Sequence, residues 1–267
     1  MREVWSVKPG SKVDVAALDP ANTRALKGGR TAANAAIADN EASLTELQMR
    51  LWAESRRSLL LILQGTDASG KDGTIAHVFR GVNPQGTRVT SFKPPTAEEL
   101  AHDFLWRIHR AVPRAGEIGI FNRSQYEDVL VARVRKLVPK QVWKKRYANI
   151  TTFETLLAHG GTTIIKCCLL ISKDEQRRRF ESRLKDPQKR WKFQRSDVED
   201  RLLWKEYQLA YSEAIERTST KDAPWYVIPA DHKWFRNWAI SQILIETLTE
   251  LDPKYPDPPD LAGIQIV

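Results

Sequence analysis

Unbroken apolar runs alternate along the chain with segments whose apolar residues recur at helical spacing. Leu59–Leu63 is an unbroken apolar run, typical of a central parallel strand covered on both faces, and Thr162–Ile171 is the strongest strand signal after it. Between Ser43 and Arg56 the apolar positions fall three and four residues apart, as on one face of a helix. The alternation predicts βαβ units, and hence a parallel sheet with right-handed crossovers.

The whole pattern predicts a single domain with five strands. The expected strands are 59–63, 87–92, 116–121, 162–171 and 225–228. The expected helices are 43–56, 72–79, 97–109, 125–136, 142–157, 173–183, 197–217 and 234–251. No repeat or low-complexity linker divides the chain. We expect a domain over residues 43–252, an extension over 1–42 that wraps over it without forming its core, and a proline-rich tail over 253–267.

A glycine loop follows the first strong strand. Residues 65–71 have the G-x-x-x-x-G-K spacing of a phosphate-binding loop, with Asp72 where Ser or Thr is usual. Gly65 and Gly70 permit backbone angles that let N–H groups converge on phosphate oxygens, and Lys71 adds a mobile positive charge. The strand before and the helix signal after supply the context that such a loop needs. We therefore expect a phosphate site rather than an ordinary glycine turn with a surface lysine.

Two aspartates at this loop predict a bound cation. Asp67 lies inside the loop and Asp72 replaces the usual hydroxyl, so carboxylates would stand beside phosphate. That arrangement costs Coulomb energy unless a cation lies between the negative groups. Mg²⁺ prefers oxygen ligands, so we expect one or two Mg²⁺ ions here, with Mn²⁺ as an alternative ion. For Asp72 alone, capping of the following helix is an open alternative.

Polar residues after the other strands are expected to share the same crevice, because ligands collect at the carboxyl ends of strands in open α/β sheets. Lys93 follows the second strand, and Asn122 and Arg123 follow the third. These residues would converge with the loop.

A dense basic stretch crosses a proline late in the chain. It holds Arg177, Arg178, Arg179, Arg183, Lys185, Lys189, Arg190, Lys192 and Arg195. We name residues 177–200 the lid segment, because small kinases with this loop carry a mobile lid at this place. Lid arginines stabilise charge on a transferred phosphoryl group and exclude water. The alternative is a solvated helical face, which is the simpler interpretation for Arg177 and Arg179. A second basic run over 133–146 either extends a positive channel or forms an exposed surface.

Composition narrows the partners and the compartment. The net charge of +9 favours an anionic partner, such as a nucleotide, a polyanion, a nucleic acid or a membrane surface. The only cysteines, Cys167 and Cys168, are adjacent in an apolar run, as in the core of a reduced protein. The sequence contains no Cys-x-x-Cys and no His-x-x-x-His pair, so a structural zinc site is not expected. Without an apolar signal core or a bilayer-long apolar run, a cytoplasmic protein is expected.

Several long motifs in this order resemble the polyphosphate kinase 2 family. They are residues 65–73, 102–107, 121–127, 191–193 with Asp197 and Arg201, and 223–233. The resemblance covers about residues 43–251. It implies a P-loop kinase fold of the three-layer α/β/α type, with a central five-stranded parallel sheet and a helical lid. It also implies Mg²⁺-dependent phosphoryl exchange between inorganic polyphosphate and a nucleotide.

One departure from the family pattern indicates the acceptor. Many members that phosphorylate nucleoside diphosphates have Asp in place of Asn122 and Asn in place of Glu127. The form found here resembles the branch that accepts AMP, part of which also accepts ADP. The resemblance thus implies reversible transfer of the terminal phosphoryl group of polyphosphate to AMP, ADP or both, giving ADP and ATP. Without a carboxylate at Asn122, the main metal role moves to Asp67.

The residues and the resemblance together predict a set of roles. Catalysis is assigned to Asp67, Lys71, Arg123, Arg178 and Arg190. Polyphosphate binding is assigned to Gly65, Ala68, Ser69, Gly70, Lys71, Asp72, Gly73, Lys93 and Arg123. Nucleotide binding is assigned to Arg107, Asn122, Glu127, Lys189 and Trp191. The metal ligands are expected to be Asp67 and Asp72.

Two other functions stay open on the residues alone. One is an ATP-dependent kinase of a small metabolite on the same fold. The other is a non-enzymatic nucleic-acid-binding protein that uses the basic surface with Trp191 as a stacking group, which leaves Asp67 and Asp72 unexplained. We expect no nucleic-acid or membrane partner. Family members tend to self-associate, so a homo-oligomer is expected.

Overall fold

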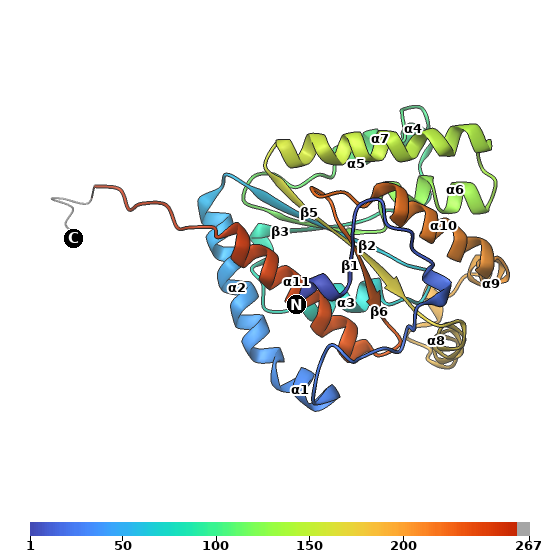
Figure 1. Ribbon diagram of the computed structural model, residues 1–267, viewed down its shortest axis with the longest axis horizontal. Helices are drawn as coiled ribbons and strands as arrows, with labels where there is room; N and C mark the ends of the chain where they lie inside the picture. The colour runs from blue at the N-terminus through green and yellow to red at the C-terminus, as the bar shows by residue number, and fades with distance from the viewer. Residues whose placement is uncertain (261–267) are drawn as a thin grey trace.

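A mostly parallel sheet forms the centre of the molecule (Figure 1). The computed structural model describes residues 1–260. Within them the strands pair in the order β1-β6-β5-β2-β4-β3, and only β1 runs antiparallel to its neighbour. The strands are β1 Ser6–Val7, β2 Ser58–Gln64, β3 Thr87–Ser91, β4 Ile118–Asn122, β5 Thr162–Leu170 and β6 Trp225–Pro229.

The central strand β2 has no polar face. Every residue from Ser58 to Gln64 is buried, and Leu61 lies opposite Ile120 of β4 and Ile165 of β5. A strand that is apolar on both sides must be covered on both sides, which explains why this run occupies the middle of the sheet. Its carboxyl end therefore opens between those of β4 and β5.

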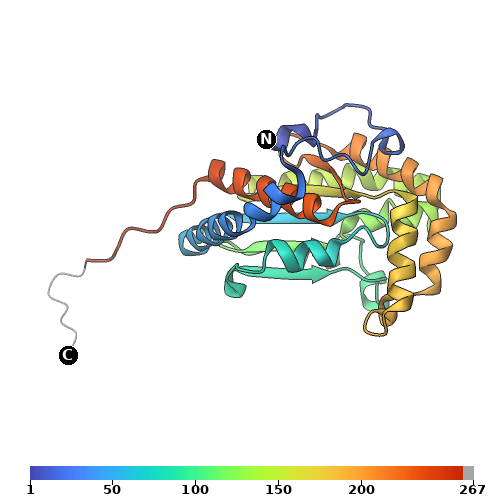
Figure 2. The same ribbon diagram turned by 90° about the horizontal axis from the view of Figure 1, so that it is seen from below.

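Helices cover both faces of the sheet, and α8 and α9 stand at the end toward which the parallel strands point (Figures 1 and 2). One hydrophobic layer packs α1, α2, α3 and α11 against the sheet, and the other packs α5, α6, α7 and α10. The bounds are α1 Gly29–Ala35, α2 Ile37–Glu54, α3 Lys71–Val78, α4 Ala97–Leu100, α5 Trp106–His109, α6 Val131–Val134, α7 Lys140–His159, α8 Lys173–Lys185, α9 Arg195–Leu202, α10 Trp204–Thr218 and α11 Lys233–Leu251. This arrangement confirms the predicted three-layer α/β/α architecture.

The sheet has a sixth strand, which the prediction of five lacked. It comes from the N-terminal segment, which joins the core instead of only wrapping over it. Trp5 is 6% exposed and packs edge-on against Phe235 and Trp238, with ring centroids 6.1 and 5.9 Å apart. The expected helix over 43–56 also begins earlier, at Ile37. The N-terminal strand β1 was missed because the few apolar residues around it follow no regular period.

Three expected helices are interrupted. The helix predicted over 97–109 is divided into α4 and α5, and that over 125–136 into the 3₁₀ turn Gln125–Asp128 and α6. The third, predicted over 197–217, breaks at Leu203 between α9 and α10. Asp103 accepts a hydrogen bond from the Leu105 N–H, and Ser124 accepts one from the Tyr126 N–H. Such local side-chain bonds compete with continuous helix.

The remaining segments are short turns and ends. Further 3₁₀ turns are Arg2–Val4, Val15–Ala17, Pro84–Gly86 and Arg190–Lys192, the last inside the loop expected over 186–195. Of the expected tail, residues 253–260 form no helix or strand, and 261–267 lie outside the described residues. In the described part of the chain, none of the helices combines the length and the apolar character needed to cross a membrane.

Burial of Trp5 makes the N-terminal segment part of the stability of the domain. We predict that Trp5→Ala lowers the free energy of unfolding by about 3 kcal/mol, because a large core side chain is lost together with its packing. Val4→Ala is the matched control, since Val4 is 69% exposed and should change stability little. Chemical denaturation of both variants measures the difference. Equal stability of the two would show that the segment only rests on the surface.

Candidate active site

The glycine loop after β2 has the tight backbone that its spacing predicts. Gly65 and Gly70 adopt φ angles of 149° and 103°, which other residues resist. A Cβ atom on Gly65 would lie 2.7 Å from the Leu169 carbonyl oxygen. Ala68 has a φ of 62°, an uncommon value for a residue with a side chain. The loop is thus a compact turn that leads directly into α3.

Lys71 lies over this loop. Its ammonium donates to the Gly65 carbonyl at 2.7 Å and is 3.4 Å from both the Thr66 carbonyl and the Ser69 hydroxyl. The residue is only 8% exposed. Burial, and then the nearby charge of Arg123, lowers the pKa of Lys71 to about 8. The positive charge is therefore placed at the loop and is poorly solvated.

Arg123 joins the turn after β4 to the loop. Its guanidinium donates to Asp67 Oδ1 at 2.7 Å and to Glu127 Oε2 at 3.1 Å. The charge of Glu127 raises the pKa of Arg123 above its ordinary value; burial opposes this effect, and Asp67 adds to it. Arg123 has a left-handed φ of 65°, so the turn holds its backbone in an unfavourable conformation. The structure brings these three predicted residues together.

A buried ionic network holds the turn that carries Arg123. Glu154 Oε1 accepts from the Tyr126 hydroxyl at 2.8 Å and from Gln125 Nε2 at 3.0 Å, while its Oε2 accepts from Lys166 Nζ at 2.6 Å. All four residues are buried. Because a buried charge without its partner is costly, this network fixes the turn from behind.

Asp72 connects the loop, the end of β4 and the lid segment. It accepts from Asn122 Nδ2 at 2.7 Å and from Lys192 Nζ at 3.1 Å. Partial burial acts to raise the pKa of Asp72, but these two hydrogen bonds lower it overall. Helix α3 has Gly70 as its N-cap and no side-chain cap, so the capping alternative for Asp72 is wrong.

Arg107 is placed beside the site rather than at the loop. It is 9% exposed and donates to the Lys93 carbonyl at 2.9 Å. Its Nη2 lies 3.8 Å from Asp128 Oδ2, and its Nη1 lies 3.6 Å from Glu99 Oε2. The side chain of Lys93 itself is exposed.

Four predicted residues of the lid segment lie at the surface away from the loop. The Arg178 side chain is 71% exposed and pairs with Glu175 at 2.7 Å, and Arg190 Nε donates to the Leu184 carbonyl at 2.8 Å. Lys189 pairs with Asp186, and Trp191 is 74% exposed. The structure gives none of these four a contact with the loop.

Three residues that contact the loop have no role at the loop in the predicted set. Gln176 donates to the Asp67 carbonyl at 3.0 Å, and Arg179 donates to the carbonyls of Ala68 and Ser69 at 2.8 and 3.0 Å. Arg236 donates to the Ser69 carbonyl at 3.3 Å. Gln176 and Arg179 are three apart in α8, and Arg236 is a charge inside an apolar helix. Those patterns were the available signals.

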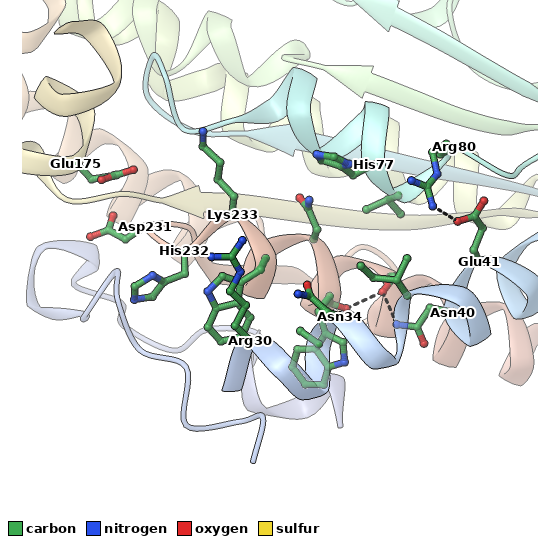
Figure 3. Close-up of a pocket in the computed structure, with 17 residues that line it drawn as sticks. Arg30, Asn34, Asn40, Glu41, His77, Arg80, Glu175, Asp231, His232 and Lys233 are labelled. Carbon is green, nitrogen blue, oxygen red and sulfur yellow. Dashed lines mark hydrogen bonds and ion pairs between the residues drawn. The ribbon is translucent and has the colours of Figure 1, made fainter. Parts of the chain in front are cut away.

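A cavity of about 530 Å³ opens on the other side of α3, between α1, α2 and α11 (Figure 3). Its charged lining is balanced, with Arg30, Arg80 and Lys233 against Glu41, Glu175 and Asp231. Arg80 and Glu41 pair with each other at 2.6 Å. This lining offers no excess of positive charge, so the loop remains the better anion site.

The oxygen donors at the loop suit a Mg²⁺ ion that is also held by phosphate and water. They do not form a complete metal site made of protein ligands. In residues 1–260 no three His, Cys, Asp or Glu side chains form a metal cluster. Asp67 Oδ1 binds Arg123, and no hydrogen bond is formed by Oδ2 with the described residues. Mg²⁺ is commonly held by one or two carboxylates together with phosphate oxygens and water. Asp67 and Asp72 can supply such a partial site.

The fold and this site define a phosphate-binding-loop protein of the α/β class. The sequence model described as Polyphosphate kinase 2 (PPK2) matches residues 28–256, and the chain belongs to this family.

Relatives and a solved structure agree with this assignment. The chain is 56% identical over 254 residues to an AMP/ADP-polyphosphate phosphotransferase of Meiothermus ruber, covering 95% of each chain. It is 47% identical over 226 residues to an ADP-polyphosphate phosphotransferase of Rhodopseudomonas palustris, covering 80% of this chain and 78% of the relative. The crystal structure of polyphosphate kinase 2 from Arthrobacter aurescens TC1 superposes with a TM-score of 0.92 at 44% identity, covering 99% of this chain and 93% of that one.

The lowered pKa of Lys71 predicts pH-dependent anion binding. In the protein without bound anion, Lys71 is charged below about pH 8 and attracts an anion. Above that pH its charge is lost. Sulfate keeps a constant charge over this range, so its affinity should fall as the pH rises through about 8. Calorimetry without divalent ions measures this fall, and Lys71→Met should remove the step. A sulfate affinity that stays constant from pH 7 to 9 would contradict the assignment of Lys71.

Proposed function

We propose that this chain transfers the terminal phosphoryl group of inorganic polyphosphate to AMP and to ADP, in a reversible reaction that requires Mg²⁺. The observation that carries the proposal is the loop over residues 65–71 with the Lys71 ammonium above it, in a member of the polyphosphate kinase 2 family. The names of the relatives support polyphosphate as the donor and adenine nucleotides as acceptors.

The donor end of polyphosphate would be held at the loop. Backbone N–H groups at the start of α3 and the positive end of that helix attract phosphate oxygens. Lys71 supplies a positive charge, and its ammonium can exchange the hydrogen bond to the Gly65 carbonyl for one to a phosphate oxygen. Because the ammonium is poorly solvated, its exchange of a carbonyl for a phosphate oxygen loses little hydration.

Mg²⁺ would be held at Asp67 and Asp72, with Asn122 beside Asp72 as a neutral neighbour. When bound, the ion neutralises the charge that develops on the phosphoryl oxygens. Asp67 is oriented for this by Arg123 at 2.7 Å. Mn²⁺ is an alternative ion for the same oxygen donors.

The acceptor phosphate is already ionised, so the reaction needs position and charge neutralisation more than a general base. Arg123 lies beside Asp67 and would contact the transferred group. Glu127 keeps Arg123 in place, and Arg107, fixed at the Lys93 carbonyl, would orient the acceptor. A direct role for Arg178 or Arg190 requires the lid segment to move from its position here, as does a contact of Lys189 or Trp191 with the nucleotide.

The assay for this function uses AMP, Mg²⁺ and long-chain polyphosphate without ATP, and follows ADP and ATP. Product that forms only with polyphosphate, disappears with a chelator and returns with added Mg²⁺ supports the proposal. Consumption of ATP with a small metabolite, and no reaction with polyphosphate, would replace it with the ATP-dependent kinase. Binding to single-stranded nucleic acid without any turnover would favour the hypothesis of a non-enzymatic nucleic-acid-binding protein.

Removing the loop lysine should remove most of the rate. We predict that Lys71→Ala lowers kcat/KM for polyphosphate by about a hundredfold or more, because one preorganised positive donor at the reacting phosphate is lost. Lys221→Ala is the control, since Lys221 is an exposed lysine outside the site. Steady-state kinetics with AMP compare the two variants. Near-normal turnover of Lys71→Ala would refute the role of the loop.

A further inference from the structure

Arg179 uses all its donor positions at the rear of the loop. Nη1 donates to the carbonyls of Ala68 and Ser69 at 2.8 and 3.0 Å, while Nη2 donates to those of Ala230 and Asp231 at 2.6 and 3.0 Å. Nε donates to Glu175 at 2.7 Å. The side chain is 10% exposed. A single guanidinium therefore ties the loop to the end of β6.

Arg236 approaches the same peptide from α11. It is 1% exposed, and its Nη1 donates to the Ser69 carbonyl at 3.3 Å. Its Nε and Nη2 donate to Asn237 Oδ1 at 3.1 and 2.8 Å, and no ion pair links it to a described carboxylate. A Cβ on Gly70 would collide with the Arg236 guanidinium. A glycine at this position therefore makes room for Arg236 and also permits the φ angle of the loop. Burying a cation without an ion pair costs free energy. The position of Arg236 therefore indicates a role beyond packing.

The geometry of a trans peptide gives these contacts a consequence. The C=O and the following N–H of such a peptide point in opposite directions. Both arginines draw the Ser69 carbonyl to the rear, which turns the Gly70 N–H toward the phosphate side. Arg179 also holds the Ala68 carbonyl, beside a backbone with a φ of 62°, while the Ser69 N–H of that peptide donates to the Thr66 carbonyl inside the loop.

We propose that Arg179 and Arg236 are positioning residues, a rear clamp that holds the loop backbone in the conformation that binds the donor phosphate. The inference rests on the proposed function and names residues that act through the loop without touching polyphosphate. Their two positive charges also stand behind the loop and add to its attraction for an anion. The charge of Arg179 contributes, after burial, to lowering the pKa of Arg236 to about 9, which reflects how close the two cations lie.

Lysine substitutions separate this role from charge alone. Arg179→Lys and Arg236→Lys keep a positive charge but lose the planar fork that spans several carbonyls. We expect each to raise KM for polyphosphate and to weaken tripolyphosphate binding by about tenfold to a hundredfold, the scale of a small misplacement at a reacting group. KM for AMP should stay within about twofold, because the acceptor side is untouched. Arg177→Lys is the control: Arg177 lies on the same helix, is 70% exposed and, within residues 1–260, forms an ion pair only with Glu181.

The measurements are steady-state kinetics with each substrate varied, calorimetry with tripolyphosphate without divalent ions, and chemical denaturation. A selective loss on the polyphosphate side in folded variants supports the clamp. Unchanged KM and unchanged tripolyphosphate affinity in both variants would overturn it, as would equal losses for both substrates. If Arg236→Lys fails to fold, the less buried Arg179→Lys decides alone. If wild type binds tripolyphosphate but transfers nothing to AMP, the proposed function fails, while calorimetry still tests the clamp.

Discussion

The site depends on one local constraint, a loop whose backbone places the Lys71 ammonium 2.7 Å from the Gly65 carbonyl. Left-handed or otherwise unusual φ angles at Gly65, Ala68 and Gly70 make the turn tight enough for this. The lysine is buried, so its charge is held at the loop and not in solvent. The central strand, the turn after β4 and the helices α8 and α11 all contribute contacts that keep this loop in place.

Support for the loop comes from three directions that are distant in sequence: the end of β4, helix α8, and helix α11, from which Arg236 donates to the Ser69 carbonyl. Arg123 reaches Asp67 from the end of β4, and its own turn is fixed by the buried Glu154 and Lys166. Arg179 reaches the loop carbonyls from α8. Such dispersed support is expected of a site that must be preorganised, because small displacements of reacting groups are costly. Each of these contacts ends at an atom of the loop.

Regular features of the sequence predicted the architecture, and irregular ones did not. The apolar runs gave the five parallel strands, and loop spacing gave Gly65, Gly70 and Lys71 their positions. Trp5 and β1 were missed because one edge strand of two residues leaves no periodic signal. The sequence leaves Arg179 open between a lid role and a solvated face, because one-dimensional charge density cannot tell which side of α8 faces the loop. The Lys93 side chain is exposed and its carbonyl accepts a hydrogen bond from Arg107, so the polyphosphate contact expected of Lys93 stays a prediction.

The most direct test of the account is a crystal structure with tripolyphosphate bound. The account predicts phosphate oxygens within hydrogen-bonding distance of the Lys71 ammonium and of the N–H groups at the start of α3. In that structure the Ser69 carbonyl should still face Arg179. A phosphate chain bound elsewhere, with this loop unchanged and Lys71 still on the Gly65 carbonyl, would contradict it.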